Sequence, residues 1–262
     1  MNLIKPKKSL GQNFLIDKNV IDLIIDAGNI EKNDVVFEVG PGTGNLTQKI
    51  LSKEPKKIFT VEKDKILAKK LVEKFKDKIC MINKDILHIN EENLSNRPMI
   101  VFGNLPYNIS AKILINWVMQ ENLNLLFKNF ILMFQKEVAD RIVANVNSSK
   151  YGRLSILTNW KMKPLKIKDI NPDNFYPKPK VKSSIVCIEP KKNFFYLNSC
   201  KNLEKVTNIF FQNKRKMIKK PINMLFKNPK NVIDKLNLDI RSRPQNLDVP
   251  TFLKISKEYE DQ

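Results

Sequence analysis

The chain contains 262 residues, with 47 Lys and Arg against 27 Asp and Glu, which gives a formal net charge of +20. That length can bury the cores of one large domain and one small domain, and the charge favours a polyanionic partner over a basic surface that is only solvated. No apolar segment approaches the roughly 20 residues of a transmembrane helix, so nucleic acid is a better candidate for that partner than a membrane.

The three cysteines and the single histidine limit the metal sites and catalytic groups that the chain can form. Cys80, Cys187 and Cys200 lack metal-ligand spacing and are odd in number, which is typical of free thiols in a reducing cytosol. The only histidine is His88, so most zinc sites and any triad built on histidine are excluded. The N-terminus lacks the apolar core and cleavage site of a secretory signal. We therefore expect a cytoplasmic protein without a metal site.

Apolar strands alternate with amphipathic helices from the N-terminus to about position 190. Asp17 is expected to be the N-cap of a helix that passes through Val20 and Ile24 and ends near Gly28. Strands are expected at residues 34–39, 57–62, 79–84, 99–103 and 130–134, and further helices at 46–53, 64–76, 110–119 and 136–144. This alternation predicts an α/β fold with a doubly wound, mostly parallel sheet, which is a Rossmann-like arrangement.

The chain changes character near residues 189–192. Before that point we expect a helix at 151–163 and strands at 166–170 and 183–188, with a proline-stiffened loop at 175–181. Beyond it the pattern is helical, and the segment 191–262 holds 16 Lys and Arg against 7 Asp and Glu, a net charge of +9 that leaves +11 for the segment 1–190. We therefore expect two domains, 1–190 and a small all-helical domain at 191–262, with the second more densely basic and suited to bind nucleic acid.

Three glycines follow the expected strand at 34–39. At a turn from strand to helix, Gly40, Gly42 and Gly44 permit positive φ and let backbone N–H groups approach a ligand. Glu62 ends the next strand along the chain, where a carboxylate can bind a ribose diol. Asp85 ends the third strand, within reach of an adenine amino group. The G-x-G-x-G spacing does not imply a ligand with a pyrophosphate, which favours S-adenosylmethionine. The alternative for the glycines is a purely structural turn, and the alternative for Asp85 is a helix cap.

The tetrapeptide Asn104-Leu105-Pro106-Tyr107 ends the fourth strand at the same edge of the sheet. An adenine N6 is a poor nucleophile because its lone pair is delocalised into the ring. The Asn104 side-chain carbonyl and the Leu105 backbone carbonyl can accept both N–H groups and aim that lone pair. Pro106 stiffens the turn and Tyr107 offers a face for stacking. Phe175 is a candidate for the opposite face, with a position in the hydrophobic core as its alternative. The two motifs together predict methyl transfer from S-adenosylmethionine to an adenine amino group; an Asn-Pro turn with a buried tyrosine is the alternative.

With these residues placed, the chain resembles the small-subunit ribosomal RNA adenine dimethyltransferase family. The similarity lies in five segments that span most of the catalytic domain in order, at residues 8–15, 38–47, 104–110, 151–154 and 175–183. The resemblance implies N6 dimethylation of two adjacent adenosines in a hairpin near the 3′ end of the small-subunit RNA, late in assembly. We expect a monomer whose partners are that RNA and the assembling small ribosomal subunit.

The resemblance also implies roles for individual residues. Around the cofactor it adds two positions, Asn13 and Leu15, to Gly40, Glu62, Asp85 and Asn104. In the tail, residues 211–216 resemble the family's basic helix. We expect one side of that helix to contact RNA phosphates, through Lys214, Arg215, Lys216 and Lys219.

Other functions remain as alternatives. A large-subunit RNA adenine methylase of the antibiotic-resistance kind would share the cofactor and the base clamp, but residues 11–15 and Leu105 favour the small-subunit family. A non-catalytic RNA-binding assembly factor would share the fold, and the intact Glu62, Asp85 and Asn104 argue against it. A nicotinamide dehydrogenase is a more distant alternative, because no obvious proton donor lies beside the cleft.

Overall fold

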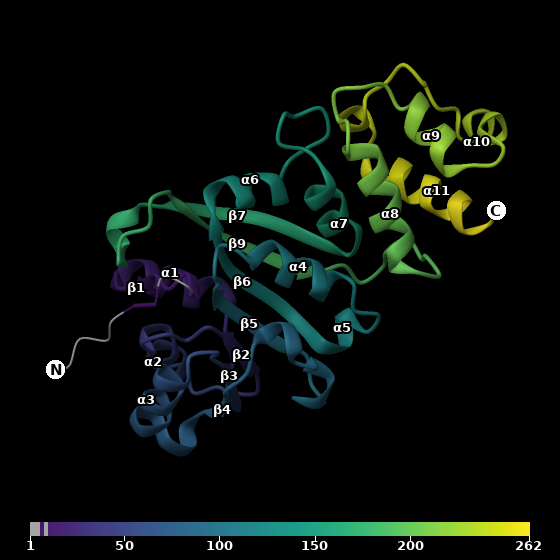
Figure 1. Cartoon of the computed structure of the whole chain (residues 1–262). Coiled ribbons are helices and arrows are strands. Elements are labelled where there is room, and N and C mark those ends of the chain that lie inside the picture. The colour runs from purple at the N-terminus through teal and green to yellow at the C-terminus, as the bar shows by residue number, and fades with distance from the viewer. Residues whose placement is uncertain (1–5, 8–9) are drawn as a thin grey trace. The chain divides into compact units, whose positions relative to one another are not determined.

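Seven strands form the central sheet of the protein, whose computed structural model describes residues 6, 7 and 10–262. Their order is β4 (Cys80–Ile82), β3 (Lys57–Val61), β2 (Val35–Val39), β5 (Met99–Asn104), β6 (Phe127–Gln135), β9 (Ser183–Pro190) and β7 (Met162–Ile170). The first five strands run parallel, and β9 pairs with β6 in the antiparallel direction. The predicted doubly wound, mostly parallel sheet is therefore confirmed (Figure 1).

The strand order reverses between β2 and β5. From β2 the chain continues to β3 and β4 on one side, and it then returns to β5 on the other side. Ligands of open α/β sheets bind in the crevice at the carboxyl ends of the strands at such a switch point. The glycine turn follows β2 and the tetrapeptide follows β5, so both lie at this edge.

Helices alternate with the strands of this sheet. They are α1 (Lys18–Gly28), α2 (Asn45–Leu51), α3 (Lys65–Phe75), α4 (Ser110–Val118), α5 (Leu123–Leu126) and α6 (Lys136–Ile142), with 3₁₀ turns η2 (Lys76–Lys78), η3 (Ile86–His88), η4 (Glu91–Asn93) and η5 (Pro172–Asn174). The side chain of Asp17 accepts a hydrogen bond from the Val20 N–H at 2.9 Å, which confirms its predicted role as the N-cap of α1.

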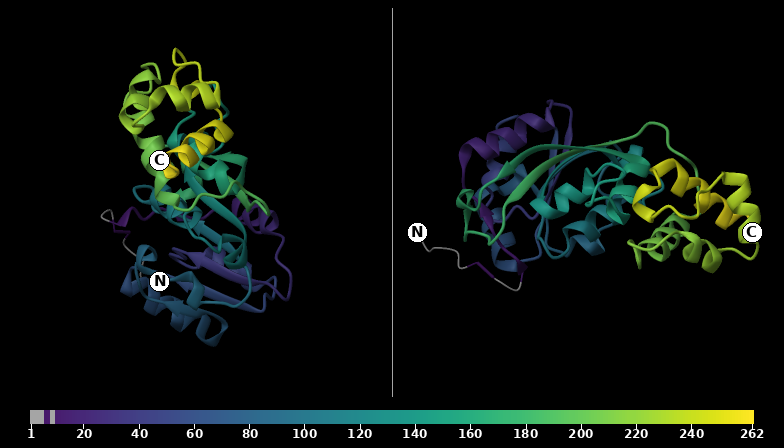
Figure 2. Two further views of the ribbon diagram at one scale, coloured as in Figure 1. Left: turned by 90° about the vertical axis from the view of Figure 1, so that its right-hand side faces the viewer. Right: turned by 90° about the horizontal axis from the view of Figure 1, so that it is seen from above.

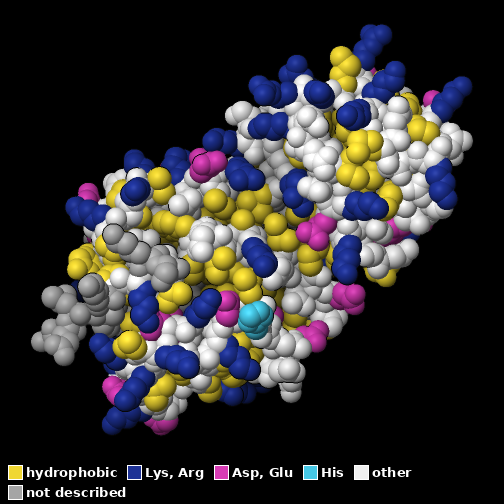
Figure 3. Space-filling view, in the orientation of Figure 1, with side chains coloured by type: hydrophobic (Ala, Val, Ile, Leu, Met, Phe, Trp, Pro, Cys, Tyr) yellow, Lys and Arg dark blue, Asp and Glu magenta, His cyan; other side chains and the backbone are white. Residues whose placement is uncertain are grey.

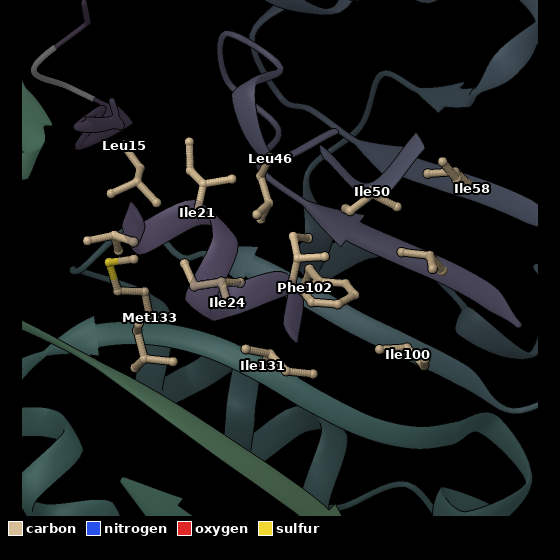
Figure 4. Packing of buried hydrophobic residues seen from close by; sticks show 14 of the residues in the cluster. Leu15, Ile21, Ile24, Leu46, Ile50, Ile58, Ile100, Phe102, Ile131 and Met133 are labelled. Carbon is tan, nitrogen blue, oxygen red and sulfur yellow. The ribbon is translucent and has the colours of Figure 1, made fainter. Parts of the chain in front are cut away.

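The main core lies between α1, α2 and the sheet. Ile21 and Ile24 from α1 lie close to Phe102 on β5 and to Ile131 on β6, all of them buried (Figure 4). The approach of α1 to β5 is close, because a Cβ added at Gly28 would lie 2.3 Å from the Phe102 ring. This packing fixes α1 against β5, the strand that ends in the tetrapeptide.

A separate two-stranded sheet joins distant parts of the chain. Strand β1 (Phe14–Leu15) pairs in the antiparallel direction with β8 (Phe175–Tyr176). The pairing brings the proline-rich loop to the N-terminal segment. Lys8 and Ser9, which open the motif at 8–15, lie outside the described residues.

Contacts divide the chain into two units. The first contains the described residues up to Ala139 together with Pro164–Pro190, and the second contains Asp140–Lys163 and Lys191–Gln262. The expected division at residue 190 coincides with one of these borders. Residues 140–163, which we expected in the first domain, instead group with the second unit. Helix α7 (Arg153–Lys161) packs there against α8 (Cys200–Phe211) and α11 (Val249–Glu260).

The second unit is helical beyond β9, as predicted. Its helices are α8 (Cys200–Phe211), α9 (Lys219–Leu225), α10 (Pro229–Leu236) and α11 (Val249–Glu260), with the 3₁₀ turn η6 (Pro244–Asn246). Figure 2 shows these green and yellow helices gathered into one bundle. The rings of Phe210 and Phe252 pack edge to face in the core of this bundle, with their centroids 5.3 Å apart. No helix in the described part of the chain is long and apolar enough to cross a membrane.

Candidate active site

A cavity in the first unit opens at the carboxyl ends of β2, β3 and β5. It is lined by five stretches of chain, at residues 10–15, 38–43, 61–63, 84–87 and 103–109, together with Ile24, Asn45, Leu46 and Leu67. The structure therefore brings together the glycine turn, Glu62, Asp85 and the Asn104 tetrapeptide, which lie far apart in the sequence. Asn13 and Leu15 also line it, whereas Phe175 is absent from the lining.

The glycine turn needs residues without a side chain. Gly40, Gly42 and Gly44 all have positive φ, between 58° and 79°. A Cβ added at Gly42 would lie 2.8 Å from the ring of Phe14, so packing as well as conformation excludes other residues there. The turn passes close to β1, and Gly40 and Gly42 line the cavity. Gly44 does not line it, and lies instead against Leu71 and Phe75 of α3.

Glu62 links this turn to the end of β3. One carboxylate oxygen accepts a hydrogen bond from the Gly42 N–H at 3.2 Å, and the other accepts one from the Asp64 N–H at 2.8 Å. The side chain is buried, and burial raises the pKa of its carboxyl group. Glu62 thus supports the turn, while its remaining lone pairs can accept hydrogen bonds from hydroxyl groups.

Glu38 is a second buried carboxyl group in the cavity lining, and no role was predicted for it from the sequence. It accepts a hydrogen bond from the Thr47 hydroxyl at 2.7 Å. Burial, only partly opposed by that hydrogen bond and reinforced by the neighbouring Glu62, raises the pKa of Glu38 to about 8. Glu38 could have been predicted as a site residue from the sequence, because it is an acidic residue inside an otherwise apolar strand and lies next to the glycines.

Asp85 caps a turn and also faces the cavity. Its carboxylate accepts a hydrogen bond from the Leu87 N–H at 3.0 Å and forms an ion pair with Lys63 at 2.9 Å. Partial burial raises the pKa of Asp85, but these two interactions outweigh it and hold the pKa below its ordinary value. The ionised carboxylate keeps lone pairs for another donor, such as an exocyclic amine. Its predicted contact with adenine stays a prediction.

The orientation of Asn104 is set by the N-terminal segment. Its side-chain N–H donates to the backbone carbonyl of Asn13 at 2.7 Å. Because the amide nitrogen is engaged there, the amide oxygen remains an acceptor. Next to it, Leu105 is 1% exposed and holds the backbone of the tetrapeptide in place. The Asn13–Asn104 bond therefore joins two regions that the resemblance placed around the cofactor.

Tyr107 is held by a hydrogen bond to strand β9. Its hydroxyl lies 2.5 Å from the hydroxyl of Ser183, which is fully buried. Burial raises the pKa of Tyr107, and the bond to Ser183 opposes this only in part. The neutral ring lines the cavity, as Asn104 does.

Phe175 lies in the hydrophobic core, which was the alternative to its predicted place on the face of the base. It is 1% exposed and belongs to the main hydrophobic core together with Leu15, its partner across the β1–β8 pair. The alternation of side chains along β8 turns Phe175 inward and Tyr176 outward. In this structure, Phe175 thus supports the core and offers no free face.

The basic residues of the tail also differ from expectation. Lys214, Arg215 and Lys216 lie in the turn between α8 and α9, so their expected helical spacing is wrong. The reason is the buried Ile218, whose N–H donates to the Ser242 carbonyl at 2.9 Å and ties this turn to a second basic segment.

The two basic segments border a groove in the second unit. It is lined by Arg215, Lys216, Met217, Lys219, Lys220, Asn223, Met224, Arg241 and Arg243. Among the described residues, no acidic group forms an ion pair with any Lys or Arg of that lining. Basic side chains are also spread over the face of the second unit that Figure 3 shows. Arg241 and Arg243 were not predicted as part of this surface, because they are distant in the chain from the basic turn.

Comparisons with known proteins agree with this site. A family model described as ribosomal RNA adenine dimethylase matches residues 4–261. A ribosomal RNA small subunit methyltransferase A from Pelagibacter ubique is 52% identical over 258 residues, which cover 98% of each chain. A protein of the same description from Wolbachia sp. subsp. Brugia malayi is 39% identical and covers 95% of this chain and 96% of its own.

Solved structures share the fold. A dimethyladenosine transferase from Plasmodium falciparum superposes with a TM-score of 0.80 at 30% identity, over 95% of this chain and 98% of that one. The 23S rRNA methyltransferase ErmE superposes with a TM-score of 0.71 over 95% of this chain and all of that one. At 21% identity, the second likeness concerns the fold alone.

Proposed function

The chain belongs to the ribosomal RNA adenine dimethylase family. From this premise we propose that the protein is an S-adenosylmethionine-dependent enzyme. Its reaction is the dimethylation of the N6 atoms of two adjacent adenosines in a hairpin near the 3′ end of small-subunit ribosomal RNA. The high identity to relatives described as small-subunit methyltransferases favours this substrate over large-subunit RNA.

The lining of the cavity fits S-adenosylmethionine. Glu62 suits the ribose hydroxyls, Asp85 suits the adenine amine, and the open backbone around Gly40 suits the amino-acid part. This cofactor supplies a methyl group on a sulfonium centre, which is already a good leaving group. Displacement of the methyl group from a sulfonium does not itself call on a metal ion.

The chain's own contribution to the chemistry is alignment. The amide oxygen of Asn104 and the Leu105 carbonyl accept hydrogen bonds from the target N6, so the nitrogen lone pair points away from them, toward the methyl donor. Tyr107 supports the ring, and its position is held by Ser183. A strong general base is unnecessary, because N6 becomes positively charged on methylation and its proton then passes readily to water. Positioning of this kind can account for much of the rate.

The observation that carries this proposal is the hydrogen bond from Asn104 to Asn13, which leaves an acceptor oxygen beside the cofactor cavity. The experiment is a transfer assay with methyl-labelled S-adenosylmethionine and separate, unmethylated small and large ribosomal subunits. We expect label on the small subunit alone. Label on the large subunit alone would support the antibiotic-resistance type of methylase, and cofactor binding without transfer to either subunit would support a non-catalytic RNA-binding factor.

We further propose that the groove of the second unit binds RNA phosphates. Two observations support this proposal. The Lys and Arg side chains of the groove are exposed and have no acidic partners among the described residues, and the hydrogen bond from Ile218 to Ser242 joins the two segments that carry them. Lys214, at the edge of the same turn, donates to the Ser149 carbonyl at 3.4 Å. In this account the partner is the assembling small subunit, and the protein acts on it as a cytoplasmic monomer with its three cysteines as free thiols.

A further inference from the structure

Asp64 is a buried carboxylate that does not line the cavity and has no part in the proposed reaction. It caps α3, since its Oδ1 atom accepts a hydrogen bond from the Ile66 N–H at 2.9 Å. Its Oδ2 atom contacts residues that are distant in the chain. That oxygen lies 2.9 Å from the Nζ atom of Lys7 and accepts a hydrogen bond from the Gln12 side-chain amide at 3.2 Å. One oxygen therefore binds the helix, and the other binds the N-terminal segment.

The Asp64 carboxylate is ionised and well shielded from water. Its side chain is 3% exposed, whereas the side chain of Lys7 is 45% exposed. Burial alone would raise the pKa of Asp64, but hydrogen bonds from Lys7, from the Ile66 N–H and from Gln12 hold it below its ordinary value. A carboxylate in such a position interacts more strongly with its donors than one in an exposed pair, because salt and solvent screen it less.

The segment that Asp64 binds forms part of the cavity wall. Lys7 and Gln12 are also bonded to each other, since the Lys7 N–H donates to the Gln12 side-chain oxygen at 2.7 Å. Gln12 lies in the stretch 10–15 that lines the cavity. Through its backbone N–H, Asp64 also donates to Glu62, the carboxylate suited to the ribose. Asp64 thus joins the N-terminal wall of the cavity to the end of β3.

We propose that Asp64 is a positioning residue that holds the N-terminal segment in the cavity wall and thereby sets the affinity for S-adenosylmethionine. This inference rests on the proposed function, since it concerns the cofactor of that reaction. A cavity whose wall is in place only part of the time binds its ligand more weakly, in proportion to that fraction. Bound cofactor in turn holds the wall in place. Loss of the Oδ2 contacts should therefore weaken binding and leave the rate at saturating cofactor nearly unchanged.

The substitution Asp64→Asn separates the two oxygens. The amide keeps an oxygen for the Ile66 N–H, but its NH₂ group replaces Oδ2 and repels the donors of Lys7 and Gln12. A hydrogen bond to a charged group is strong enough to change an equilibrium by about 10- to 150-fold. We expect calorimetry to show that S-adenosylmethionine binds about 10-fold more weakly to this variant, the lower end of that range.

The matched control is the same substitution at another helix N-cap. Asp248 accepts a hydrogen bond from the Thr251 N–H at 2.9 Å at the start of α11, in the second unit. Asp248→Asn should bind S-adenosylmethionine with wild-type affinity. Two variants of the exposed partner test the contact without a change in the core. Lys7→Met should weaken cofactor binding, and Lys7→Arg, which keeps the cation, should retain it.

Methylation of small subunits then separates positioning from a merely structural role. We expect Asp64→Asn to be slow at limiting S-adenosylmethionine and to recover nearly the wild-type rate at saturation. Wild-type cofactor affinity in Asp64→Asn would overturn the inference, and so would a slow rate that persists at saturation. If a thermal melt shows that Asp64→Asn is unfolded, equal affinities of Lys7→Met and Lys7→Arg would overturn it. Failure of the wild-type protein to bind S-adenosylmethionine would instead refute the proposed function.

Discussion

The orientation of Asn104 makes a specific prediction about two substitutions. Asn104→Ala removes both the acceptor for the target N6 and the donor to Asn13. Asn104→Asp keeps acceptor oxygens but replaces that donor with a carboxylate, which the Asn13 carbonyl repels. We expect both variants to be slow, since the acceptor must be present and also correctly aimed.

The expected decrease in rate for Asn104→Ala follows from the loss of one oriented polar group at the reacting atom. Such a loss costs about 2–4 kcal/mol of barrier, or about 30- to 900-fold in rate. The assay is single-turnover transfer of labelled methyl groups to small subunits with saturating enzyme, so that binding does not limit the rate. Subunit affinity should barely change, because Asn104 makes only one of the many interactions that hold the RNA.

A thermal melt is the necessary control. Asn104→Ala leaves the Asn13 carbonyl without its donor, which costs up to about 1–3 kcal/mol of stability if that oxygen stays buried. A folded Asn104→Ala protein that methylates at nearly the wild-type rate would refute the assigned role. In that case the Leu105 carbonyl alone would suffice to orient the base.

Three further predictions concern the cofactor, the buried acid and the tail. Glu62→Ala should weaken S-adenosylmethionine binding by about 1.5–3 kcal/mol, and unchanged affinity by calorimetry would make Glu62 purely structural. The pKa of Glu38, about 8 against an ordinary 4.5, means that its contribution to the free energy of unfolding is fully present below pH 4.5 and is lost as the pH rises through 8. Urea denaturation at about pH 5 and about pH 9 should therefore show a smaller decrease for Glu38→Gln than for the wild type, and equal decreases would contradict the raised pKa. Changing Lys214, Arg215 and Lys216 together to Gln should lower the salt dependence of subunit binding, by slightly less than one unit of slope for each phosphate that is no longer neutralised; an unchanged slope would place RNA recognition in the first unit.

Much of the fold could be predicted because the buried strands of a parallel sheet are continuous apolar runs. The run at 34–39 corresponds to β2, which is fully buried. Edge strands were harder to predict. Strand β7 begins at Met162 and not near residue 166. Only its first and last residues are buried, so it contains no continuous apolar run, and Pro164 interrupts the pattern. The order of the strands required the structure.

The site was predicted where its residues lie in one motif, and was missed where distant segments meet. The glycine turn and the tetrapeptide are local signals. The pairing of β1 with β8 joins segments near opposite ends of the first unit's sequence, and only that pairing shows that Phe175 points into the core and Tyr176 outward. In the same way, the tether between Ile218 and Ser242 makes the basic segment a turn, which composition alone cannot indicate.

The most direct test of the central claim is to identify the methylated nucleoside. Small subunits that lack the modification would be incubated with the purified protein and labelled S-adenosylmethionine, and their RNA would then be digested and mapped. The account predicts N6,N6-dimethyladenosine at two adjacent positions in the hairpin near the 3′ end. Label at any other position, or on an atom other than the adenine N6, would contradict it.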